Sequence, residues 1–282
     1  MKAIKQWWGR RTRREKSAMV IGALVVTGSI ILVIALRPAP TASIYVTSLS
    51  GESEPSFITN GRDPAWAPDG SSIALSSEAD GGEFSIYLAD VVDFEVEFVT
   101  DGMDPSWAPD GSRIAFTGDP SSERPGVYIV DLVTRTSRFL TDGQQPNWAP
   151  DGQRLAFTGH DEGGKPGIYV IDVETLDVQF ITDGQQPDWS PDGGRIAFVS
   201  RDSGQSAELY VIDLDSSEVT FVTEGDEPSW SPDGSLIAFT GSGDDGPGVF
   251  SVRPGETPVQ VADGQDPTWA PDGQALAFVS GD

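Results

Sequence analysis

The chain has 282 residues and carries 44 acidic against 18 basic side chains, which gives a formal net charge of −26. A body this acidic repels phosphate backbones, so the composition argues against nucleic-acid binding. The absence of cysteine excludes disulfides, thiolate metal sites and cysteine nucleophiles, and a single histidine, His160, excludes multi-histidine metal sites and paired-histidine catalysis.

Residues 17–36 form a run of twenty residues without a charge. As a helix with a rise of about 1.5 Å per residue, this run is long enough for the roughly 30 Å of a bilayer core. A buried core helix is disfavoured because the run is apolar on all faces. A cleaved signal peptide has a shorter apolar region of about 7–15 residues, and here Arg37-Pro-Ala-Pro follows. The sequence therefore predicts a transmembrane signal anchor.

The charges around this run predict its orientation. Residues 1–36 hold seven Lys or Arg and one acidic residue, and the Lys and Arg residues all precede the run. Basic flanks stay on the cytoplasmic side and meet lipid headgroups there. We expect a single-pass protein of the cell membrane with a cytoplasmic segment 1–16, an anchor 17–36, a linker 37–42 and an extracytoplasmic domain 43–282.

The rest of the chain is an internal repeat. Six segments follow the pattern x-P-x-W-[AS]-P-D-G, and successive tryptophans are separated by 41, 41, 41, 41 and 39 residues. Each unit predicts four short strands, because the Trp segment is followed by a Pro-Asp-Gly turn, an apolar Ile-Ala-Phe segment, an aromatic segment and a Phe-Val-Thr-Asp-Gly segment. Forty-one residues in four strands match one blade of a propeller.

The count of strands predicts how the ring closes. The chain ends after the first two strands of a sixth unit, and residues 43–46 and 56–61 match strands three and four. The sequence therefore predicts an all-β, six-bladed β-propeller in which N-terminal strands complete the C-terminal blade.

This repeat resembles the TolB-type propeller repeat, a distant relative of the WD40 repeat, over residues 43–282. The Gly-His and Trp-Asp pairs of true WD repeats and the N-terminal α/β domain of TolB have no counterpart in the sequence. The resemblance implies a protein-binding platform in the cell envelope. We therefore expect a non-catalytic propeller that binds an envelope protein or an extracellular ligand.

The loops that enter each blade carry two sets of repeated polar positions. The first set, here called the inner ring, mixes carboxylates and amides: Asp63, Asp104, Gln145, Gln186, Glu227 and Asp266. The second set, here called the outer ring, precedes a glycine in each loop: Asn60, Asp101, Asp142, Asp183, Glu224 and Asp263. The inner ring predicts a polar channel mouth that binds a basic partner, whereas the outer ring is typical of turn residues that cap their own backbone. Solvated loops remain the alternative for the inner ring.

Catalysis finds little support in the sequence. The Asp of the Pro-Asp-Gly turn recurs in all six units, as a structural residue would, and His160 lies in a polar loop without a nucleophile-elbow sequence. We assign no catalytic residue, no confident metal ligand and no cofactor. Two alternatives stay open: a propeller hydrolase or lyase acting on glycans, and a structural domain stabilised by Ca²⁺ on its carboxylates. The acidity itself has a second interpretation, as general surface charge rather than a site for a basic partner.

Overall fold

The computed structural model describes residues 19–26, 29–36, 42–49, 54–78, 83–118, 124–201, 206–243 and 246–280. The chain divides into two compact units, Met1–Thr41 and Ala42–Asp282. The predicted cytoplasmic segment 1–16 and residues 37–41 of the predicted linker 37–42 lie outside the described residues.

In the first unit, β1 (Met19–Val26) and β2 (Ser29–Leu36) pair as an antiparallel hairpin. The helix predicted over residues 17–36 is therefore not confirmed. Eight of the residues from Met19 to Leu36 are Val or Ile, whose branched side chains favour strands over helices. Within the described part of the chain, no helix has the length and apolarity that a membrane crossing requires.

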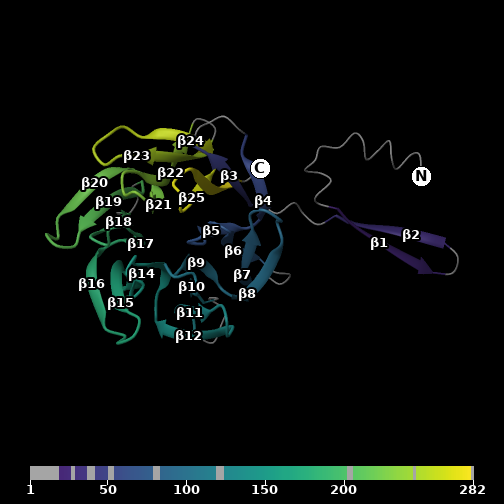
Figure 1. The fold of residues 1–282 in the computed structure, drawn as a ribbon, viewed down its shortest axis with the longest axis horizontal. Helices are drawn as coiled ribbons and strands as arrows, with labels where there is room; N and C mark the ends of the chain where they lie inside the picture. Colours follow the sequence, from purple (N-terminus) through teal and green to yellow (C-terminus); the bar gives the residue numbers. More distant parts are fainter. Residues whose placement is uncertain are drawn as a thin grey trace. The chain divides into compact units, whose positions relative to one another are not determined.

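The second unit consists of six four-stranded antiparallel sheets arranged as the blades of a propeller (Figure 1). Within each blade the first strand lies nearest the axis and the fourth lies outermost (Figure 1). Blades one to three contain β5 (Arg62–Trp66), β6 (Ser72–Glu78), β7 (Phe84–Asp90) and β8 (Val96–Asp101); β9 (Met103–Trp107), β10 (Arg113–Thr117), β11 (Val127–Asp131) and β12 (Thr136–Thr141); and β13 (Gln144–Trp148), β14 (Arg154–His160), β15 (Pro166–Asp172) and β16 (Val178–Asp183). Blades four to six contain β17 (Gln185–Trp189), β18 (Arg195–Ser200), β19 (Glu208–Asp213) and β20 (Val219–Glu224); β21 (Asp226–Trp230), β22 (Ile237–Gly243), β23 (Gly246–Val252) and β24 (Val259–Asp263); and β25 (Gln265–Trp269), β26 (Ala275–Ser280), β3 (Ser43–Ser48) and β4 (Ser56–Asn60).

The two ends of the propeller close the ring through one sheet. Strand β26 pairs antiparallel with β3, with Ser280 opposite Ser43 and Phe278 opposite Tyr45. Strand β4 then pairs with β3 on its other side. The prediction of six blades closed by N-terminal strands is confirmed.

The apolar core lies between the blades. It is divided into six clusters, each of which combines side chains of two neighbouring blades. The Ile-Ala-Phe segments of the second strands are buried, because each inner strand has a neighbouring blade on both faces. The ring is thus one cooperative packing unit.

The glycine that enters each blade is required by its neighbours. At Gly102, where φ is +147°, a Cβ atom would lie 2.5 Å from Phe116 Cδ2 and 2.7 Å from the Thr117 carbonyl oxygen. Any side chain there would displace the second strand. The glycine therefore lets the loop pass close over the blade and delivers the inner-ring residue two positions later to the axis.

Candidate functional site

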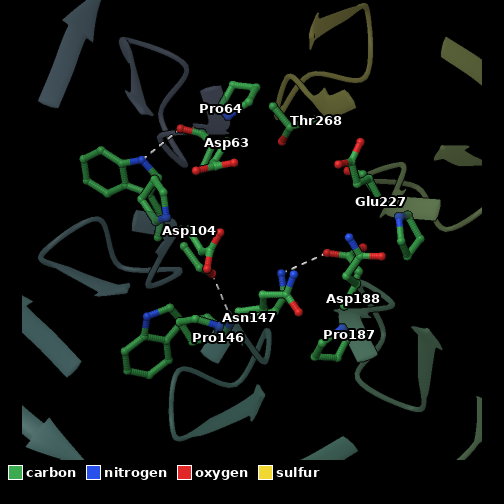
Figure 2. A pocket seen from close by; sticks show the side chains of 18 of the residues that line it. Asp63, Pro64, Asp104, Pro146, Asn147, Pro187, Asp188, Glu227 and Thr268 are labelled. Carbon is green, nitrogen blue, oxygen red and sulfur yellow. Dashed lines mark hydrogen bonds between the residues drawn. The ribbon is translucent and has the colours of Figure 1, made fainter. Parts of the chain in front are cut away.

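The six inner-ring residues meet around one cavity of about 370 Å³ on the propeller axis. Figure 2 shows Asp63, Asp104 and Glu227 around this opening. Each residue stands at the second position of a first strand, and the proline that follows it also lines the cavity. Residues separated by about forty positions in sequence thus share one small space.

Every inner-ring residue has left-handed backbone geometry. Their φ angles lie between 50° at Asp63 and 55° at Asp266. Residues other than glycine rarely adopt this region, at a cost on the order of 1–3 kcal/mol each. Because all six blades share it, the conformation belongs to the repeat, and it holds each side chain in a fixed direction at the cavity wall.

A belt of hydroxyl groups links the inner ring from blade to blade. Thr117 Oγ1 donates to Asp104 Oδ2 at 2.8 Å and accepts from the Gln145 backbone N–H at 2.8 Å. Thr158 does the same between Gln145 Oε1, at 3.1 Å, and the Gln186 N–H, at 3.0 Å. Each of these hydroxyls therefore orients one ring side chain and fixes the backbone of the next.

The belt is interrupted in two blades. The position of Thr158 is taken by Val199 in blade four and by Val279 in blade six, and valine has no hydroxyl to donate. In blade four the consequence is visible, because Gln186 Oε1 is buried without a hydrogen-bond partner. Among the described residues, the amide of Gln186 is thus held less firmly than that of Gln145.

The carboxylic acids of the inner ring resist ionisation. Burial, followed by the charge of nearby Asp63, raises the pKa of Asp104 to about 7. Burial and the charges of Asp63 and Glu227 raise the pKa of Asp266 well above its usual value. Burial also raises the pKa values of Asp63 and Glu227. A negative charge in the cavity is therefore costly, and either protonation or a positively charged group nearby would relieve that cost.

A second layer lies two residues further along each first strand, and sequence reasoning missed it. Asp188 accepts hydrogen bonds from Asn147 Nδ2 at 2.9 Å and from the Trp230 N–H at 2.6 Å, and both Asp188 and Asn147 line the cavity (Figure 2). Burial raises the pKa of Asp188 to about 7. The signal was present in the repeat, since this position varies from Ala65 to Asp188 while the flanking Pro and Trp do not change.

The outer ring does not share the cavity. All six of its residues are exposed, and none of them lines the cavity wall. Asn60 Oδ1 accepts from Ser43 Oγ at 3.2 Å, and Asp101 Oδ1 accepts from Ser85 Oγ at 3.0 Å. These residues thus stabilise the loops of their own blades.

The other polar residues singled out in the sequence lie away from the cavity. Turn residues such as Asp69 accept from the backbone N–H two positions later, at 2.9 Å from Ser71, which explains their recurrence in every blade. His160 is exposed at the end of β14. In the described part of the chain, no three His, Cys, Asp or Glu residues are grouped so as to hold a metal ion. The Ca²⁺ alternative therefore stays a prediction without a ligand set.

The chain is similar to known proteins in both sequence pattern and structure. Residues 144–282 match the family model of the TolB beta propeller domain. TolB from Acinetobacter baumannii is 25% identical with a TM-score of 0.68 over 81% of this chain, which spans 66% of that protein. A putative TolB from Agrobacterium tumefaciens is 21% identical with a TM-score of 0.72, covering 86% of this chain and 98% of that one.

Other propellers share the fold alone. An oligogalacturonate lyase from Vibrio parahaemolyticus is 14% identical with a TM-score of 0.53, covering 93% of this chain and 97% of that one. No protein of curated function matches the chain in sequence. The repeat, the closed ring of six blades and the match of residues 144–282 to the family model lead to one conclusion: the propeller of this chain is similar to the TolB beta propeller domain.

Proposed function

We propose that this protein is a membrane-anchored, extracytoplasmic propeller that acts as a non-catalytic binding platform in the cell envelope. Its channel mouth would dock a basic segment of a partner protein. The proposal goes beyond the fold, because a propeller by itself does not define a function.

One observation carries the docking proposal. Four inner-ring carboxyl groups, from Asp63, Asp104, Glu227 and Asp266, converge with Asp188 on one cavity of about 370 Å³. Burial disfavours the charge of each of them. An inserted ammonium or guanidinium group would supply the missing counter-charge. Gln145 and Gln186 complete the wall with amides, which suit hydrogen bonds to a peptide backbone.

An enzymatic role has no comparable support. The likeness to the oligogalacturonate lyase rests on 14% identity and carries the fold alone. His160 is exposed and lies outside the cavity lining. We therefore propose binding rather than glycan cleavage.

The anchoring proposal rests on the uncharged run 17–36 and on the basic residues before it. Membranes from cells that express the full chain should retain it through alkaline carbonate washing. A protease added to intact spheroplasts should digest the propeller and leave residues 1–16 protected. Release by carbonate, or protection of the propeller, would contradict the anchor or its orientation.

The docking proposal is tested by affinity capture from native membrane extract with residues 42–282 as bait. A second bait carries Asp63→Asn, Asp104→Asn, Glu227→Gln and Asp266→Asn. Because burial already raises the pKa values of these groups, the amides should not impair folding.

A third bait serves as the matched control. It neutralises four exposed outer-ring residues, Asp101, Asp142, Asp183 and Asp263, to asparagine, and so changes the net charge by the same amount outside the cavity. A partner retained by the first and third baits but lost by the second supports docking at the channel mouth. Equal, salt-sensitive retention by all three would instead mean that only the surface charge binds.

A further inference from the structure

The chain enters the propeller on the face where the channel opens. Ser43, the first residue of β3, lies opposite both Asn60, the last residue of β4, and Ser280, the last residue of β26. Strand β4 leads directly into the loop that carries Asp63 to the cavity. The N-terminal end of β3 and the channel mouth therefore share one face of the propeller.

Two hydrogen bonds fix this entry point. The Gly61 N–H donates to the Ala42 carbonyl oxygen at 3.2 Å, and Ser43 Oγ donates to Asn60 Oδ1 at 3.2 Å. Gly61 is the glycine that enters blade one, and it precedes Asp63 by two positions. The first residues of the propeller are thus attached to the same loop that delivers Asp63 to the cavity.

The tether between the entry point and the uncharged run is short. The run ends at residue 36, and only residues 37–41, two of which are prolines, separate it from Ala42. Because an extended chain advances at most about 3.3–3.6 Å per residue, the steps from residue 36 to residue 42 cover at most about 20 Å. The six residues of β3 alone extend over about 20 Å. Turning the mouth away from the bilayer would therefore use the whole tether to pass the height of one blade.

Charge keeps this face away from anionic headgroups. All six outer-ring residues lie on it and are exposed, and five of them are acidic. The basic side chains Lys165 and Arg201, also on this face, form ion pairs with Asp183 and Asp226. Repulsion from anionic lipid acts over a Debye length of about 8–10 Å. The mouth thus faces a layer of water above the headgroups, into which a basic chain segment is attracted.

We propose that the channel mouth opens toward the bilayer to which the chain is anchored, and that its occupant is the basic juxtamembrane segment of a membrane-embedded protein. This inference rests on the anchoring and docking proposed above, and it adds the source of the partner. A segment that extends from a membrane span already lies in the water layer under the mouth. Confinement to the same bilayer raises its effective concentration there.

The orientation is measured on the full chain in liposomes. The chain has no cysteine, so one introduced cysteine gives a single labelling position. In blade two, Asp142→Cys places a fluorophore on the mouth face, and Val133→Cys places it in the exposed β11–β12 turn at the opposite end. About 20 Å of strand separates the two positions. Energy transfer to headgroup-labelled lipid should be at least about twofold more efficient from position 142.

A variant with a long tether is the matched control. An insertion of about forty Gly and Ser residues after Pro40 has a root-mean-square length of about 35 Å and should make transfer from the two labels equal. Equal transfer in the original chain, retained by the liposomes after carbonate washing, would overturn the proposed orientation. Loss of the chain in that wash would contradict the anchor and, with it, this proposal.

The occupant is tested with two synthetic probes that carry the same basic sequence, Gly-Gly-Lys-Arg-Lys-Arg. In one probe this sequence extends from a transmembrane helix of leucine and alanine, and in the other it is a soluble peptide. Crosslinking from a benzophenone amino acid in place of Gln145, which lines the cavity, should reach half-saturation at a total concentration at least about tenfold lower for the membrane probe. The long-tether variant should lose most of this advantage and still bind the soluble peptide.

The outcomes separate this inference from the docking on which it rests. Conversion of Asp63, Asp104, Glu227 and Asp266 to amides should abolish crosslinking of both probes. Equally strong crosslinking of the soluble and membrane probes would indicate a soluble partner, which would overturn this inference and leave the docking intact. Crosslinking of neither probe would contradict the docking itself.

Discussion

Asp188 provides a direct test of the electrostatics inside the channel. Burial raises its pKa from 3.8 to about 7. An acid with a raised pKa in the folded state holds its proton more tightly there than in the unfolded chain. Its contribution to stability is therefore complete below about pH 4 and is lost as the pH rises through about 7.

The structure sets the size of the effect. A pKa that moves from 3.8 to about 7 corresponds to about 4 kcal/mol of stability lost at pH 8 relative to pH 4. Asparagine at this position avoids that loss, but its NH2 group replaces one of the two carboxylate oxygens that accept separately from Asn147 and from the Trp230 N–H, and the lost hydrogen bond costs about 1 kcal/mol. We expect Asp188→Asn to be more stable than wild type by about 3 kcal/mol at pH 8.

Urea unfolding of residues 42–282, followed by tryptophan fluorescence at pH 4 and pH 8, measures both effects. The control Asp233→Asn should have the opposite effect and be less stable than wild type at pH 8. Hydrogen bonds from Ser231 and Ser235 lower the pKa of Asp233 to about 2, so its stabilisation is present at neutral pH and is lost as the pH falls through about 2. If Asp188→Asn lowers stability at pH 8, or leaves the difference between the two pH values unchanged, the account of the buried carboxyl group is wrong.

Two further substitutions test the closure and the hydroxyl belt. Ile44→Ala in β3, where Ile44 is fully buried, should lower the free energy of unfolding by about 2–5 kcal/mol in a denaturant titration, and a loss under about 0.5 kcal/mol would mean that the closing sheet is dispensable. Val199→Thr should raise stability by about 1 kcal/mol, because the new hydroxyl reaches the unpartnered Gln186 Oε1. Val249 is also fully buried but lies on β23, outside the hydroxyl belt. The change Val249→Thr should therefore lower stability by about 1–3 kcal/mol, because it buries a hydroxyl group. Equal effects at both valines would contradict the belt.

Most of the fold could be predicted from the sequence repeat. The x-P-x-W-[AS]-P-D-G pattern predicted six blades, and the match of residues 43–46 and 56–61 to strands three and four predicted the closing sheet, which the β26–β3 pairing confirms. Turn and strand signals recur with every blade, so local chemistry and global closure agree.

The site was only partly predictable. The inner ring could be located because its members occupy the same place in each repeat. The left-handed φ angles of those residues, the belt through Thr117 and Thr158 and the second layer at Asp188 depend on the distance between blades, which spacing in sequence does not report. For the segment 17–36 the sequence pattern did not distinguish between two structures, because an uncharged run rich in Val and Ile fits both a membrane helix and a pair of strands.

Site-specific photo-crosslinking in native membranes tests the central claim, that a partner docks at the channel mouth. A benzophenone amino acid would replace Gln145 at the cavity in one variant and Asp272, in a Pro-Asp-Gly turn at the other end of a first strand, in a second. The account predicts one discrete adduct from position 145 that is absent from position 272 and is lost when Asp63, Asp104, Glu227 and Asp266 are converted to amides. Identical adducts from both positions, or an adduct at position 145 that persists without these carboxyl groups, would contradict it.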